Sequence, residues 1–241
     1  MKKWMLLLFV TVSLPALSQL NLKRQIPEKK VFDTSVVDPE YGIMLYEPLN
    51  FQLKGDSVRM CGTYACQSWV EDVYTTGALL HKGFYIDGQL KTYKNYYPNG
   101  NIERDFRAVD NYRSSAKLYY ENGQLKSEIR YNDGDTEFWV DYNEKGIKVY
   151  EEQSVKSMEY LEFRNFYFDS GSPDKLMILK DKKKLNYTYQ EYHSNGKLKI
   201  DGHKLYDTNR FEYVNHGTWK YYDESGNLVK EELWEKGEKV K

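Results

Sequence analysis

Apolar and polar residues alternate along most of the chain, in short runs that are separated by turn sequences. One such turn is Asn122-Gly123, and Asn-Gly between alternating residues is the strongest short-range signal for a β-hairpin. If this turn is type I′, Tyr120 faces Leu125 on a mostly apolar face. On the opposite, polar face Lys117 then pairs with Glu128. The pattern therefore predicts two antiparallel strands, each with one apolar and one charged side.

The same hairpin recurs along the chain with a glycine at each turn. The seven turn glycines are Gly77, Gly100, Gly123, Gly146, Gly171, Gly196 and Gly226. The first four follow one another at 23 residues, the next two at 25 and the last at 30. A fixed period in this range indicates stacked supersecondary units, and two strands with two turns leave no room for a helix. We therefore expect an all-β fold, an elongated antiparallel sheet of seven stacked hairpins over residues 71–241.

The first residues have the pattern of an export signal. Lys2 and Lys3 precede an apolar run at residues 4–12, and small residues follow before Gln19. This pattern predicts a signal peptide over residues 1–18, because the apolar run is shorter than the ~18–20 residues that span a membrane. The mature chain is then expected to be periplasmic or secreted. No later stretch is apolar enough to span a membrane. Residues 19–40 are charged, contain two prolines and are predicted to be a linker.

Residues 41–70 form an N-terminal region that contains both cysteines. Residues 51–60 are expected to form a hairpin that turns at Gly55-Asp56, just before Cys61 and Cys66. In an exported chain an even pair of cysteines indicates a disulfide. Metal binding is the alternative, but two cysteines without a nearby histidine cannot complete a tetrahedral site. We predict a structural Cys61–Cys66 bridge.

Composition and charge narrow the class of partner. Aromatic residues make up 16% of the chain, with 23 tyrosines, which is too aromatic for a disordered protein. The formal net charge is −1 and becomes −3 once the two lysines of residues 1–18 are removed. Nucleic-acid-binding proteins carry a basic excess. The sequence therefore predicts no nucleic-acid partner.

Two stretches resemble a known repeat. Residues 119–128 (YYENGQLKSE) and 217–228 (GTWKYYDESGNL) are similar to the bacterial variant of the MORN repeat, which occurs in YwqK-type antitoxins of toxin–antitoxin systems. The resemblance extends over residues 71–241. It implies a repetitive antiparallel hairpin sheet and brings no catalytic residues with it.

Carboxylates recur at the fifth position after the turn glycine. They are Asp105, Glu128, Glu151, Asp201 and Glu231. Glycosidases use paired acids, but strand counting places Lys94 opposite Asp105 and Lys117 opposite Glu128. We therefore interpret these acids as structural ion pairs. The four histidines are scattered over different units, and no nucleophile or phosphate-loop motif is present. We expect no catalytic residues, no metal and no cofactor.

The aromatic residues remain as candidates for binding. Exposed rings could stack on sugars or hold an extended chain, or they could merely cover the sheet. The binding residues that we predict belong to the second and third units and are Tyr96, Tyr97, Tyr119 and Tyr120. We expect an exported, non-enzymatic binding or scaffolding module at the bacterial envelope, with another protein or an envelope component as partner. The alternatives are antitoxin-like neutralisation of a protein toxin and a carbohydrate-binding or hydrolysing surface. The sequence leaves the oligomeric state open.

Overall fold

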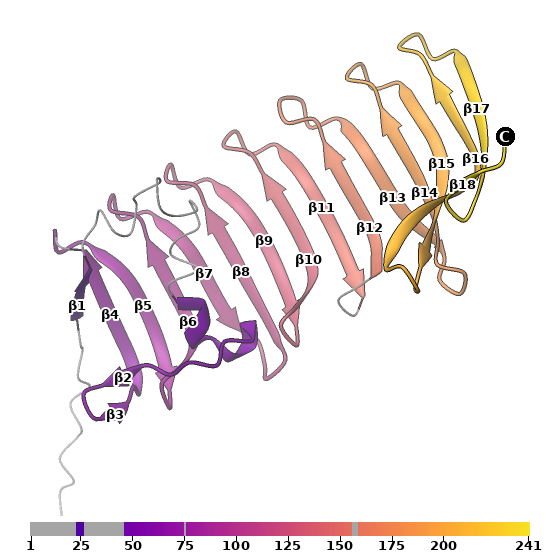
Figure 1. Ribbon diagram of the computed structural model, residues 1–241. Helices are drawn as coiled ribbons and strands as arrows, with labels where there is room; N and C mark the ends of the chain where they lie inside the picture. Colours follow the sequence, from indigo (N-terminus) through magenta and orange to yellow (C-terminus); the bar gives the residue numbers. More distant parts are fainter. Residues whose placement is uncertain (1–22, 27–45, 75, 156–158) are drawn as a thin grey trace, which may run out of the picture.

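The computed structural model describes residues 23–26, 46–74, 76–155 and 159–241. The predicted signal peptide, residues 1–18, lies outside the described residues, as does most of the predicted linker. Sixteen strands form one elongated sheet whose order follows the chain from β4 to β18, with β1 beside β4 at the first edge (Figure 1). Every pair from β4 onward is antiparallel. This confirms the expected all-β sheet of successive hairpins.

The fifteen antiparallel strands differ little in length until the last one. They are β4 (Ser68–Tyr74), β5 (Leu79–Ile86), β6 (Gln89–Tyr96), β7 (Ile102–Ala108), β8 (Arg113–Tyr119), β9 (Leu125–Asn132), β10 (Asp135–Tyr142), β11 (Lys148–Val155), β12 (Glu159–Phe166), β13 (Pro173–Asp181), β14 (Asn186–Tyr192), β15 (Leu198–Asp207), β16 (Glu212–Tyr222), β17 (Leu228–Glu235) and β18 (Glu238–Lys239). The seven turn glycines all have a positive φ, between 68° and 88°. They lie in the turns from β4–β5 to β16–β17.

The turn at Gly123 differs from the predicted type I′ turn. Asn122 is not among the residues with positive φ, whereas a type I′ turn needs positive φ at both central positions. Instead, Tyr120 N–H donates to the Gln124 carbonyl at 2.8 Å, which closes a three-residue loop. The partner of Leu125 is therefore Tyr119 and not Tyr120, with a bulge between positions 118 and 119. The predicted pairing of Lys117 with Glu128 is confirmed, because it lies beyond the bulge.

The N-terminal region does not form the predicted hairpin at residues 51–60. Two 3-10 helices are found there, η1 (Glu47–Leu49) and η2 (Phe51–Leu53). The Asn50 side chain caps η2 by accepting from the Gln52 N–H at 3.0 Å, and Lys54 ends it in a left-handed conformation. A small hairpin follows, β2 (Met60–Cys61) and β3 (Tyr64–Ala65). Cys61 and Cys66 lie at disulfide-bonding distance beside it, with their Cα atoms 4.9 Å apart, as predicted.

The remaining N-terminal strand is β1 (Lys23–Ile26), which falls inside the predicted linker. It pairs with β4 in parallel, in contrast to the other neighbours in the sheet. Its backbone therefore covers the hydrogen-bonding groups at the first edge, which an edge strand would otherwise leave unpaired.

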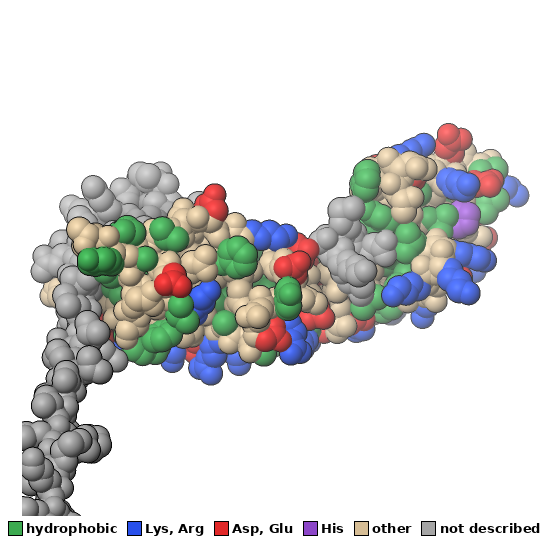
Figure 2. All heavy atoms as spheres, turned by 90° about the horizontal axis from the view of Figure 1, so that it is seen from below, with side chains coloured by type: hydrophobic (Ala, Val, Ile, Leu, Met, Phe, Trp, Pro, Cys, Tyr) green, Lys and Arg blue, Asp and Glu red, His purple; other side chains and the backbone are tan. Residues whose placement is uncertain are grey.

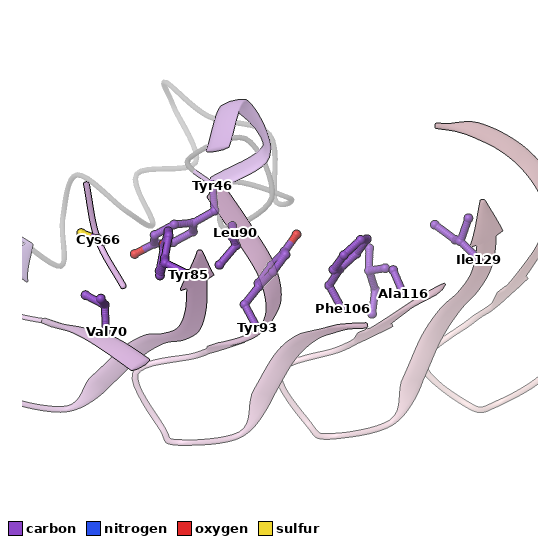
Figure 3. Packing of buried hydrophobic residues seen from close by; sticks show 10 residues of the cluster. Tyr46, Cys66, Val70, Tyr85, Leu90, Tyr93, Phe106, Ala116 and Ile129 are labelled. Carbon is purple, nitrogen blue, oxygen red and sulfur yellow. The ribbon is translucent and has the colours of Figure 1, made fainter. Parts of the chain in front are cut away.

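Residues 46–66, here called the cover segment, pack on one face of the sheet, here called the front face. The main hydrophobic core lies between the two (Figure 3). Its centre is a row of residues that lie opposite one another on consecutive strands, here called the central row. From β4 to β9 this row consists of Val70, Gly83, Tyr93, Phe106, Ala116 and Ile129. Side chains that lie opposite each other in a sheet contact across the strands, so the row is one continuous packing unit.

Candidate binding surfaces

Arg59 attaches the cover segment to the sheet, because its guanidinium lies between the carboxylate of Asp72 and the ring of Tyr85. Asp72 on β4 is fully buried, and Arg59 donates to both of its oxygens, at 2.9 and 2.6 Å. The Arg59 guanidinium also lies 5.4 Å from the centre of the Tyr85 ring. Tyr46 completes the site, because its hydroxyl donates to Asp72 at 2.8 Å and its ring stacks on His81 at 3.6 Å. Burial by itself would raise the pKa of Asp72. The hydrogen bonds and positive charge of Arg59 outweigh burial, so the pKa of Asp72 is lowered.

The central row continues past β9. Ile129 lies opposite Trp139, which lies opposite Glu152. The continuation, here called the open row, consists of Trp139, Glu152, Phe163, Met177, Tyr189 and Gly202, the last covered by the ring of Trp219. Trp139 is the border, because it still packs against the covered core. The cover segment lies over the first strands, and no other described segment crosses β11 and β12 in Figure 1. The same face is therefore covered in its first part and crossed by no described segment at β11 and β12, whereas Met177 on β13 is again buried, with 3% of its surface exposed.

The start of the open row combines two carboxylates with aromatic rings. Asp141 accepts hydrogen bonds from the Trp139 indole at 2.6 Å and from Ser127, and it lies opposite Tyr150 on the next strand. Glu152, only 9% exposed, accepts from the Tyr150 hydroxyl. Burial raises the pKa of Tyr150, and the carboxylate of Glu152 raises it further.

Two further rings complete this group of side chains. Phe163 lies opposite Glu152, and the Tyr150 ring centre is 6.3 Å from that of Phe163. Tyr160 also packs against Phe163, with its ring centre 6.1 Å away. We call Trp139, Asp141, Tyr150, Glu152, Tyr160 and Phe163 the acidic–aromatic cluster.

Asp141 and Glu152 have no cationic partner among the described residues, in contrast to Asp72. The cations of β11 and β12 are used on the opposite, back face. Lys148 pairs there with Glu151 at 2.7 Å, and Arg164 pairs with Glu162 at 2.8 Å. The cluster is therefore aromatic, half-buried and negatively charged.

At the far end of the open row, in contrast to the cluster, the charged side chains have partners within the chain. Lys204 lies 4.8 Å from the ring centre of Tyr189 and 5.8 Å from that of Trp219, and burial lowers its pKa. Glu232 is bridged by Lys230 at 2.6 Å and by Lys239 at 2.7 Å.

The back face carries the carboxylates that the sequence identified. Lys94 lies 3.5 Å from Asp105, and Lys117 lies 3.8 Å from Glu128, which confirms these two predicted ion pairs. Acidic and basic side chains are also interspersed along the lower edge of the sheet, which Figure 2 shows from below. Exposed pairs of this kind contribute about 0–1 kcal/mol each, so their main effect is on solubility.

A hollow of about 380 Å³ lies on the back face near β4–β7. Its lining residues include Trp69, Lys82, Thr92, Lys94, Tyr96, Asp105 and Arg107. Asp105 is the carboxylate of this lining, and it is held by Lys94 and by Arg107, whose guanidinium donates to it at 2.8 Å. The lining therefore lacks the pair of acids that glycoside hydrolysis requires.

The four tyrosines predicted to bind a partner are half-buried, so the expectation that they are exposed is wrong. The Tyr97 hydroxyl donates to the Tyr119 carbonyl, and the Tyr120 hydroxyl donates to the Tyr142 carbonyl, both at 2.8 Å. Corresponding bonds join Tyr74 to Tyr96 and Tyr167 to Tyr192. These four hydroxyls therefore each tie one hairpin to the next. Tyr96 lines the hollow on the back face.

Sequence reasoning missed the acidic–aromatic cluster. A signal was present, because Trp139 and Asp141 are two positions apart, as are Tyr150 and Glu152. Residues two positions apart on a strand share a face. The two pairs can be recognised as one site only when the register of β10 against β11 is known, because this register places them side by side.

The described ranges show neither a membrane-spanning helix nor a cluster of metal ligands. They contain no helix that is long and apolar enough to cross a membrane. In the same part of the chain, no group of three or more histidine, cysteine or acidic side chains lies close enough to hold a metal ion.

Two solved structures show a small likeness to this chain. One is a variant of S. aureus TarM in complex with fondaparinux, α-GlcNAc-glycerol and UDP, 10% identical over 36% of this chain and 18% of that one, with a TM-score of 0.28. The other is TarM, 11% identical over 40% of this chain and 19% of that one, also with a TM-score of 0.28. The matches span less than a fifth of the TarM chains, and at this score they support no conclusion.

The informative comparison is with protein families, since no curated protein matches the chain. The family model described as the MORN repeat variant matches residues 89–105, 115–133, 188–203 and 215–236. These segments correspond to β6–β7, β8–β9, β14–β15 and β16–β17, each with one turn glycine between its two strands. Four hairpins of the sheet therefore match the MORN repeat variant.

Proposed function

We propose that this protein is an exported, non-enzymatic binding module at the bacterial envelope. It holds an extended segment of a partner protein on the open row of its front face. The proposal rests on one observation: a row of side chains on the front face is covered by the chain itself along only part of its length. The row is covered by the chain's own residues 46–66 as far as β9, whereas no described segment crosses it at β11 and β12, where Phe163 is half-buried (Figure 1).

The covered part of the row supports a protein as the partner. There the sheet face is filled by irregular polypeptide that contributes a tyrosine, Tyr46, and an arginine, Arg59, to the sheet side chains. The open row continues the same face with aromatic residues, a methionine and a carboxylate. A segment of similar chemistry from another protein would bury it in the same way. Antitoxin-like neutralisation, which the repeat resemblance suggests, would be the case in which this partner is a toxin.

Two further observations support the remaining parts of the proposal. The recurring acids at positions such as Asp105 and Glu128 are in ion pairs on the back face, which favours binding over acid–base chemistry. Export rests on the basic, apolar and small-residue pattern of residues 1–18.

Site-specific photo-cross-linking in the producing bacterium tests this proposal. A photoreactive amino acid is placed at Phe163 on the open row or at Leu176 on the back face. Both side chains are half-buried and lie on neighbouring strands, so Leu176 is a matched control. We expect an adduct of one defined mass from Phe163 and none from Leu176. The adduct should be in the envelope fraction, on a chain that begins at Gln19.

Two results would overturn the proposal. The first is equal labelling at both positions, or none at either. The second is a cytoplasmic chain that retains Met1, which would contradict export.

A further inference from the structure

We propose that the acidic–aromatic cluster receives an arginine side chain of the bound segment. The guanidinium would lie against the rings of Tyr150 and Phe163 and bond to the carboxylates of Glu152 and Asp141. The inference rests on the proposed function, because it assigns a chemistry to the occupant of the open row.

The chain contains an internal precedent for this arrangement. Asp72 and Asp141 occupy the same row of the front face, immediately beside the central row. Between them the row consists of His81, Asn95, Arg104, Leu118 and Ser127. At Asp72 an arginine of the cover segment fills the site and lies over the Tyr85 ring. At Asp141 the equivalent place on the sheet has a carboxylate, and the ring of Tyr150 lies opposite it, where His81 lies opposite Asp72.

The charge balance of the cluster calls for a cation. A buried carboxylate without a cationic partner is unfavourable, and Glu152 is nine-tenths buried. Its partner is the neutral Tyr150 hydroxyl, and Asp141 is bonded by the neutral groups of Ser127 and Trp139. The cations on β11 and β12, Lys148 and Arg164, are bound on the back face. Lys175 lies in the row of Asp141 but three strands away, on β13, and pairs with neither carboxylate. A cation of the segment that covers the row would supply the missing partner.

The arrangement fits arginine better than lysine. Asp141 lies opposite Tyr150, and Tyr150 is two residues from Glu152 on the same strand. The two carboxylates are therefore on diagonally neighbouring residues, about 7–8 Å apart at the backbone. A planar guanidinium has five donors in a rigid fork, so it can bond to two carboxylates and still stack on an aromatic face. A cation over an aromatic ring adds about 0.5–2 kcal/mol, depending on its desolvation. An ammonium group is a more strongly hydrated point charge and gains less from this geometry.

A titration of the mature chain with defined peptides tests the inference. The probe is the pentapeptide acetyl-Ser-Tyr-Arg-Tyr-Ser-amide, and its control replaces arginine by citrulline, a neutral side chain of the same shape. Binding is followed by the indole N–H resonance of Trp139, which is assigned by its loss in Trp139→Phe. We expect the citrulline peptide to bind at least ten times more weakly than the arginine peptide. Glu152→Gln and Asp141→Asn should each weaken binding of the arginine peptide at least fivefold.

The back-face variant Glu128→Gln is the matched control and should bind the arginine peptide as the unmodified chain does. The inference is wrong if the citrulline peptide binds equally well, or if Glu152→Gln and Asp141→Asn both keep the original affinity. It is also wrong if neither peptide moves the Trp139 resonance. In that case cross-links from Phe163 would still support the open row as the binding surface, so the two proposals can fail separately.

Discussion

The variant Phe106→Ala is expected to lower the free energy of unfolding by about 3–5 kcal/mol, the usual loss for a large aromatic side chain removed from a core. Phe106 is fully buried under the cover segment and stacks on Tyr93, with ring centres 5.2 Å apart. Phe163 occupies the same row on the open part of the front face, where it is only half-buried. The matched variant Phe163→Ala should therefore cost about 1–1.5 kcal/mol, roughly half of the value for burying such a side chain fully.

Urea unfolding of both variants, followed by circular dichroism, measures this difference. Repeat proteins lose stability locally, so hydrogen exchange should also become faster around β7 in Phe106→Ala than elsewhere in the sheet. Equal losses for the two variants would contradict the distinction between a covered and an open part of the front face.

The variant Arg59→Ala is expected to destabilise the protein by about 3–5 kcal/mol, because it leaves the fully buried Asp72 without its cation. The cover segment should then detach from the first hairpins, and hydrogen exchange should become faster in residues 46–66. Lys117→Ala is the control, since it removes one side of an exposed pair with Glu128 and should cost at most about 1 kcal/mol. Equal losses for Arg59→Ala and Lys117→Ala would show that the buried pair does not hold the segment.

The stabilisation that Arg59 provides should decrease as the solution becomes more acidic. The pKa of Asp72 is lower in the folded protein than its ordinary value, so the unfolded chain binds the proton more tightly. The stability that this carboxylate contributes is therefore present above the unfolded pKa of about 3.9 and is lost as the pH falls through the lowered folded pKa. The difference between the unmodified chain and Arg59→Ala should shrink over that acidic range.

The repeat and much of its register could be predicted from the sequence. The glycine period and the alternation of residues specify hairpins, and cross-strand charge patterns place Lys117 opposite Glu128. The turn itself was predicted wrongly, because Asn-Gly also fits a three-residue loop in which only the glycine needs a positive φ. That difference of one residue moved the partner of Leu125 from Tyr120 to Tyr119.

The functions of individual side chains were harder to predict, because they depend on contacts between hairpins. The hydroxyls of Tyr97 and Tyr120 bond to carbonyls more than twenty residues away, and no pattern within one hairpin reveals this. The acidic–aromatic cluster needs two further facts, namely the register of β10 against β11 and the point at which the cover segment ends. The alternation within a strand contains neither of them.

Hydroxyl-radical footprinting of the mature chain tests the central claim most directly, namely that one row of the front face is covered as far as β9 and accessible at β11 and β12. The account predicts protection of Tyr85, Tyr93 and Phe106, whose exposed fractions are at most 1%. We expect oxidation of the half-buried Phe163 on the open row and of the half-buried Tyr150 in the neighbouring row. Protection of Tyr150 and Phe163 to the same degree as Tyr93 in the free protein would contradict the account, because the proposed binding surface would then already be covered.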